Sequence, residues 1–332
     1  MSLLAFVVMA FMLSMYVILD GYDLGVAVIA PIVARTEQQR RAMMESIGPF
    51  WNGNEVWLIA AGGTLFALFP LAYAASFSAF YLPFMLVLWL LMFRGIAIEL
   101  RNQFSSELWK SFWDTAFNLS SVLLVFLYGI TLGNLIRGLP LDRHAYFVGT
   151  FAFLLNPYAL GVGVLAVITL ALHGAAFLLM RVDGAPAERS RTFIKVVWWL
   201  VLALYLGLTS ATLAQRWQLA GHGISLWLAI GPFMSLGSLI ALRVLVARGA
   251  TWGVFAASTA FIVTLQILAG GTMYPYILPS YPFGSGGLRV IDAVPGAGAL
   301  ALMLTIAILG LASVCVYSYF ITRRLSGKIH VD

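Results

Sequence analysis

The chain has few charged residues, a single cysteine and few histidines. Only 10% of its 332 residues are Asp, Glu, Lys or Arg, whereas 62% are hydrophobic. A soluble domain carries about 25% charged residues, so this chain has too few polar groups to cover a surface in water. The single cysteine, Cys315, can form neither an internal disulfide nor a multi-cysteine metal site. The composition therefore predicts an integral membrane protein.

Other absences limit the chemistry. The sequence contains no Walker loop, no histidine or cysteine cluster and no nucleophile motif, so the chain alone does not resemble an enzyme. His173 is the only histidine inside a hydrophobic segment, since His144, His222 and His330 lie at or beyond segment ends. A lone histidine can ligate haem or bond to a neighbouring helix. Without a second histidine, a structural role for His173 is the better interpretation.

Long uncharged segments define the fold class. A helix needs about 20 apolar residues to cross about 30 Å of hydrocarbon. Hydropathy predicts an all-α membrane protein of about nine transmembrane helices, arranged as two four-helix bundles and one peripheral helix: 3–33, 48–69, 74–98, 114–135, 155–180, 193–215, 224–246, 252–272 and 297–322. The expected units are a first bundle (1–144), a second bundle (145–272), an outer loop (273–296) and the peripheral helix with its tail (297–332).

Basic residues are distributed unevenly between the two sets of connecting segments. Fifteen of the 19 lie near one set of helix ends, and only Arg137, Arg143, Arg216 and Arg289 lie near the other. The positive-inside rule then places the N-terminus outside and the C-terminus in the cytoplasm, with the first helix retained. This distribution also explains the basic pI without a nucleic-acid partner.

Two connecting segments have a recognisable character. Residues 105–114 (SSELWKSFWD) place their large apolar side chains on one side of a helix, which predicts a short interfacial helix. Residues 273–296 are rich in Pro, Gly and Ser, which predicts an ordered but irregular outer loop.

Charged residues inside hydrophobic segments are the candidate functional residues, because each costs about 2.5–3.5 kcal/mol at a helix centre. Asp20 and Asp23 are three residues apart and share a helical face. Two close carboxylates repel, so we expect one to be protonated or paired with a cation. They form an inter-helix polar clamp, or they conduct protons or shape a site. Gly21 and Gly25 form a small-residue pair that allows close helix approach.

The second hydrophobic segment begins with Trp51-Asn52-Gly53-Asn54-Glu55, and Glu55 lies well inside it. Asn52 and Glu55 share a face, which is compatible with a water chain that carries protons. A salt-bridged structural role for Glu55 is equally compatible. We assign structural polar roles to Trp51 and Asn54.

Arg94 lies about one turn deeper than Glu99 in the third hydrophobic segment. Arginine does not release its proton, so Arg94 requires an acidic partner, either Glu55 or the Asp20/Asp23 pair. Glu99 and Arg101 lie nearer the interface, and we expect both to extend toward water.

Several motifs resemble subunit II of the cytochrome bd quinol oxidases. They are GYDLG, GPFWNGNEVWLIAAGGTLFALFPLAYA, FRGIAIELRNQF, TLGNLIRGL, LLNPYALGVGVLAVITLALHGAAFLLMR and MYPYILPS, and they occur in order along nearly the whole chain. The short length, without long insertions, resembles the cyanide-insensitive branch.

The resemblance implies a bacterial inner-membrane heterodimer with a haem-bearing subunit I, which holds the quinol site and three haems (two b-type and one d- or b-type). It implies that this subunit binds no haem, that some members bind a structural quinone, and that the complex oxidises quinol and reduces dioxygen to water with cytoplasmic protons. A small accessory subunit is a further candidate partner. Relatives carry a proton-conducting Asp where this chain has Asn52, which leaves that role to Glu55, Asp20 or an acid of subunit I.

Two other classes fit some of these features. A proton-coupled secondary transporter would use Asp20, Asp23 and Glu55 as coupling acids, and it would favour broken helices in matched halves. A scaffold subunit would use the same residues only for packing. Co-purification with a haem-bearing partner would favour the oxidase subunit, whereas substrate binding by the isolated chain would favour the transporter.

Overall fold

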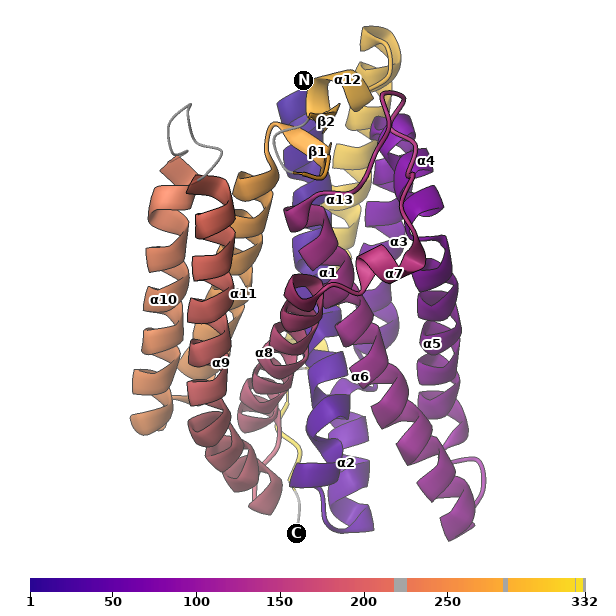
Figure 1. The fold of residues 1–332 in the computed structure, drawn as a ribbon. Coiled ribbons are helices and arrows are strands. Elements are labelled where there is room, and N and C mark those ends of the chain that lie inside the picture. The colour runs from indigo at the N-terminus through magenta and orange to yellow at the C-terminus, as the bar shows by residue number, and fades with distance from the viewer. Residues whose placement is uncertain (218–225, 283–285, 326, 331–332) are drawn as a thin grey trace.

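The computed structural model describes residues 1–217, 226–282, 286–325 and 327–330. Figure 1 shows a bundle of long helices, with the N-terminus and a small β-hairpin at one end (the hairpin end) and helix α2 at the other (the α2 end). Eight helices of the described residues are long and apolar enough to cross a membrane: α1 (Ser2–Val33), α5 (Tyr81–Leu100), α6 (Glu107–Arg137), α8 (Pro157–Arg181), α9 (Ala185–Trp217), α10 (Leu226–Ala247), α11 (Thr251–Met273) and α13 (Ala297–Leu325).

Two further helices are together long and apolar enough for a ninth crossing. α3 (Trp51–Leu68) and α4 (Pro70–Ala79) meet at a bend of 119°. Pro70 begins α4, and because it has no N–H it cannot continue the hydrogen-bond ladder of α3. The predicted start of the third hydrophobic helix at residue 74 is therefore wrong: residues 70–79 form a separate short helix, and α5 begins at Tyr81.

The predicted interfacial helix at residues 105–114 is also wrong as a separate element. Residues 107–114 are the first two turns of α6, which continues without a break to Arg137 over 31 residues. No Gly or Pro interrupts the start of this helix, so its hydrogen bonding extends into the apolar segment. At 1.5 Å per residue α6 is about 46 Å long and extends beyond the hydrocarbon core.

The helices pack as two groups with α13 at the periphery. The first group contains α1, α3, α5 and α6, the second contains α8 to α11, and α13 packs chiefly on α3. Both α1 and α6 of the first group pack on α8 of the second, and α1 meets α8 in direct backbone contact: a methyl group placed on Gly25 would overlap the carbonyl oxygen of Leu170. The close approach predicted for Gly25 is confirmed. The unit boundaries at residues 144, 272 and 296 stay predictions.

The hairpin end is ordered, as predicted, but it has more regular secondary structure than the sequence predicted. Within residues 273–296, β1 (Tyr276–Pro279) pairs antiparallel with β2 (Gly287–Arg289), and the short helix α12 (Val290–Ala293) follows. The Leu139 N–H donates to Pro279 O at 2.9 Å, and the Tyr281 N–H donates to Leu139 O at 2.7 Å. These bonds attach the hairpin to the loop between α6 and the short helix α7 (Phe151–Leu154). At the opposite end, α2 (Glu37–Ile47) is capped by the Thr36 hydroxyl, which accepts from the Gln39 N–H.

Candidate functional site

Asp20 and Asp23 lie in the half of α1 nearer the α2 end and are both fully buried. They occupy one face of the helix, as their spacing predicted, and this face points toward α3 and α5. Two acids at this depth require compensating groups, because a buried unpaired charge is strongly destabilising.

Arg94 of α5 supplies the compensating charge. Its side chain is also fully buried, and its two terminal nitrogens bind Asp20 in a bidentate pair, Nη2 to Oδ1 at 2.5 Å and Nη1 to Oδ2 at 3.0 Å. Nη1 also donates to Oε1 of Glu55 at 3.0 Å, and Nη2 lies 4.0 Å from Oδ2 of Asp23. The predicted pairing of Arg94 with these acids is confirmed. We call Asp20, Asp23, Asn54, Glu55 and Arg94 the Arg94 cluster.

Asn54, and not Asn52, is the α3 amide that joins this cluster. Its Nδ2 donates to Oδ2 of Asp23 at 2.7 Å, and it also lies within hydrogen-bond distance of the Tyr22 hydroxyl at 2.9 Å. Asn52 is exposed, because a two-residue step rotates a side chain by about 200° around the helix. The water chain through Asn52 and Glu55 stays a prediction. Glu55 lies at the edge of the buried face, with 27% of its side chain exposed.

Trp51 of the α3 motif and Glu99 of α5 lie outside the Arg94 cluster. Trp51 serves packing. Trp51 is buried, and its ring lies against the backbone of α5, 3.6 Å from where a methyl group on Gly95 would be. Glu99 is exposed near the end of α5, as expected for a side chain that reaches toward water.

Two atoms of the cluster lack hydrogen-bond partners although they are buried: Oδ1 of Asp23 and Nε of Arg94. Buried polar atoms of this kind are usually satisfied by ordered water. One further turn along α1, the hydroxyl of Tyr16 lies 3.1 Å from that of Tyr128 on α6. The sequence reasoning missed Tyr16, although its spacing of four residues from Asp20 places it on the same face.

His173 is fully buried in α8 and uses both ring nitrogens. Nδ1 lies 2.8 Å from the Ser258 hydroxyl of α11, and Nε2 lies 3.0 Å from the carbonyl oxygen of Ile18. The ring also stacks on Phe255 at 5.0 Å between centroids. The side chain thus joins α8 to α1 and α11. Of the other histidines, His222 lies outside the described residues.

Arg101 forms a second charged network, at the α2 end. Its side chain is only 1% exposed, and it binds Glu37 of α2 and Asp114 of α6, with the shortest distances 2.8 Å and 2.5 Å. The prediction that Arg101 extends toward water is therefore wrong, because α2 and α6 cover it with two carboxylates. The hydrogen bonds from Arg101 hold the pKa of the Glu37 carboxyl below its usual value of 4.5.

An apolar groove lies between α1, α3 and α13 and has a volume of about 230 Å³. Its walls include Met12, Trp57, Ala307 and Gly310. Its polar groups are few. The Thr64 hydroxyl donates to the sulfur of Met12 at 3.1 Å, and Nε1 of Trp57 is buried without a partner.

The sequence of the chain matches a known protein family over almost its whole length. Residues 1–324 match the family described as cytochrome bd terminal oxidase subunit II. The chain belongs to this family. It is therefore a subunit of a quinol oxidase complex of the bacterial respiratory chain, and the transporter alternative is set aside.

Individual relatives agree with the family assignment. The chain is 29% identical to cytochrome bd-I ubiquinol oxidase subunit 2 of Escherichia coli (strain K12), covering 95% of this chain and 91% of the relative. It is 28% identical to cytochrome bd ubiquinol oxidase subunit 2 of Bacillus subtilis, covering 96% and 95%. A chain of the bd oxidase from Geobacillus thermodenitrificans has the same fold, with a TM-score of 0.79, 18% identity and 97% coverage of both chains. Assignment to the cyanide-insensitive branch stays a prediction.

Proposed function

We propose that the Arg94 cluster holds and transfers protons for dioxygen reduction in the quinol oxidase complex. Reduction of one dioxygen to two waters consumes four protons, so the complex needs titratable groups that lead from water to the reacting oxygen. In this chain, carboxylates at membrane depth are concentrated in this cluster.

The charge count carries the proposal. One guanidinium contacts three carboxylates within 4.0 Å. Full ionisation would leave two uncompensated negative charges in a region where each costs about 2.5–3.5 kcal/mol. The cluster is therefore expected to bind protons. Asp20 holds the bidentate pair with Arg94, so the proton-carrying groups are Asp23 and Glu55. A carboxyl group can release and recapture a proton, whereas the Asn54 amide only orients its neighbours.

We also propose that this subunit binds no haem and supports a subunit I that carries the three haems, two b-type and one d- or b-type. Both ring nitrogens of His173 are occupied by protein partners, which supports a structural role for this buried imidazole. Quinol and dioxygen would then react in subunit I. The excess of basic residues at the α2 end favours a cytoplasmic position for that end, with the N-terminus outside the inner membrane.

The groove between α1, α3 and α13 fits a structural quinone. Its apolar walls suit an isoprenoid chain, and the unpaired Nε1–H of Trp57 suits a quinone carbonyl as its acceptor. A bound quinone would satisfy this donor and fill the space between α3 and α13. Exchange of Trp57 for Phe keeps an aromatic ring but removes the donor. We expect the purified complex to retain less quinone, as measured by extraction and chromatography, with an unchanged haem content.

The proton role is tested by Asp23→Asn and Glu55→Gln in the complex of both subunits. Each variant keeps the shape of the side chain and removes its titratable proton. Proton transfer through a positioned group contributes about 10²–10⁴-fold to rates, so we expect oxygen consumption to fall by about tenfold or more. Haem spectra must remain those of the wild type, which separates conduction from assembly.

Glu99→Gln is the matched control, because Glu99 is exposed on α5 and its substitution should leave the rate unchanged. Wild-type turnover in both cluster variants would show that the Arg94 cluster is structural. Mass spectrometry of the purified complex would also identify subunit I and any accessory subunit.

A further inference from the structure

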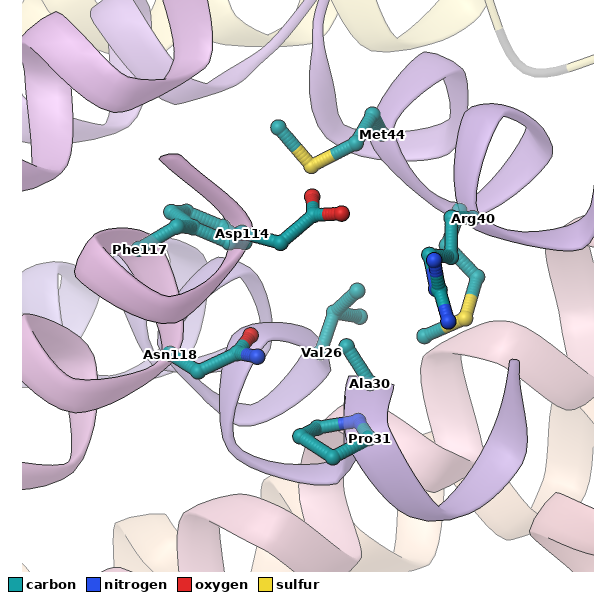
Figure 2. A pocket seen from close by; sticks show the side chains of 9 residues that line it. Val26, Ala30, Pro31, Arg40, Met44, Asp114, Phe117 and Asn118 are labelled. Carbon is teal, nitrogen blue, oxygen red and sulfur yellow. The ribbon is translucent and has the colours of Figure 1, made fainter. Parts of the chain in front are cut away.

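A small cavity with three polar side chains in its lining lies at the α2 end, between α1, α2 and α6. It has a volume of about 40 Å³, which is room for about one to three water molecules. Figure 2 shows its lining: Asp114 and Asn118 project from α6, Arg40 from α2, and Val26 and Ala30 from α1. The polar side chains thus come from α6 and α2, whereas α1 contributes only apolar ones.

Along α1, the cavity lies on the α2-end side of Asp23. Val26 and Ala30 follow Asp23 by three and seven residues, so all three lie on one helical face and Asp23 is one turn deeper. On α6, Ser121 is likewise one turn deeper than Asn118. Oδ1 of Asp23 and Oγ of Ser121 are both buried and both lack a hydrogen-bond partner. Two of the three helices that line the cavity, α1 and α6, therefore each carry an unpaired polar atom in the turn immediately beyond it.

Pro31 adds a third polar group to this region. It lines the cavity and lies inside α1, where its missing N–H leaves the carbonyl oxygen of Ala27 without its usual helical donor. In membrane helices such carbonyls are commonly satisfied by ordered water or neighbouring side chains. The step from the cavity to Asp23 thus contains acceptors for water, beside the apolar side chains of Val26 and Phe117.

We propose that water in this cavity delivers protons from the α2 end to Asp23. The route rests on the proposed proton role of the Arg94 cluster and gives it an access path that does not pass Asn52. Two charged side chains line the cavity: Arg40, and Asp114, which is held by Arg101. They position water, and the proton moves along the water to the Asp23 carboxyl.

The test uses single cysteines in the complete two-subunit complex with Cys315→Ser as the parent. Asn118→Cys places a thiol in the cavity wall. Thr115→Cys, the matched control, places one on the exposed side of the same helix. Both are treated with N-ethylmaleimide, which is neutral and bulky, and labelling is measured by mass spectrometry. Oxygen consumption is compared with the rate of the same variant before treatment, and haem spectra report assembly.

We expect labelling of Asn118→Cys to slow oxygen consumption several-fold, and to slow cytoplasmic proton uptake in a single turnover by the same factor. Labelled Thr115→Cys and the treated parent should keep their rates. The proposal is overturned if labelled Asn118→Cys retains its rate, if this thiol resists labelling while Thr115→Cys reacts, or if both labelled variants slow equally. If Asp23→Asn and Glu55→Gln are slow while the blocked cavity has no effect, the cluster conducts protons that arrive from elsewhere.

Discussion

Removal of the Arg94 guanidinium is the most direct test of the buried cluster. The variant Arg94→Leu leaves three carboxylates, two of them fully buried, without the cation that lies within 4.0 Å of all three. Breaking a buried pair by removing one partner typically costs about 3–5 kcal/mol, because the other charge stays buried and unpaired. We therefore expect assembled complex, measured as haem content per membrane protein, to fall strongly. The thermal unfolding midpoint of any purified complex should fall with it.

A double-mutant cycle isolates the electrostatic part of this loss. Asp20→Asn removes the acid that forms the bidentate pair with Arg94, so the double variant no longer buries that charge unpaired. The double variant should be less destabilised than the sum of the two single variants, by about 0.5–3 kcal/mol. An additive result would show that Arg94 and Asp20 do not interact energetically.

Arg41→Leu is the control for loss of an arginine as such. Arg41 also forms a salt bridge, with Glu45 at 2.8 Å, but the two side chains are 72% and 52% exposed. Pairs of this kind contribute about 0.3–0.5 kcal/mol, so assembly should be nearly unchanged. Arg101 is unsuitable as a control because it is buried between two acids. Equal assembly of Arg94→Leu and Arg41→Leu would refute the reasoning.

Three further predictions concern packing, pH and His173. Gly25→Leu should prevent assembly, since even a methyl group there meets the backbone of α8, whereas Gly207→Leu, with open space around it, should be tolerated; haem content of membranes measures both. Arg101 lowers the pKa of Glu37, so their pair stabilises the folded protein above pH 4.5 and loses this contribution as the pH falls through the lowered pKa. The thermal midpoint of the wild type should therefore drop more on acidification than that of Glu37→Gln, and equal drops would contradict the pairing. His173→Ala should lower the stability of the complex by about 1–3 kcal/mol, because its two partners lose their hydrogen bonds, and should leave the haem spectra unchanged; loss of a haem band would contradict the structural role.

Some features followed from the sequence because they depend on composition and length alone. A chain with 62% hydrophobic residues must use lipid as its solvent, and the thickness of the hydrocarbon core sets the length of each helix. The pairing of Arg94 was also predictable, because a guanidinium at that depth cannot become neutral and must find an acid. Gly25 indicated a close helix contact for a similar reason, since a small residue in an apolar helix allows another backbone to approach.

Other features depended on which neighbours each helix meets. The local pattern around Trp51 offers two asparagines, and only the packing of α3 against α1 decides that Asn54 faces Asp23 while Asn52 is exposed. The burial of Arg101 likewise depends on α2 and α6, which are distant from it in the sequence and cover it with two carboxylates. Helical periodicity fixes which residues share a face, but the rotation of that face toward a neighbour is set by the packing of the whole bundle.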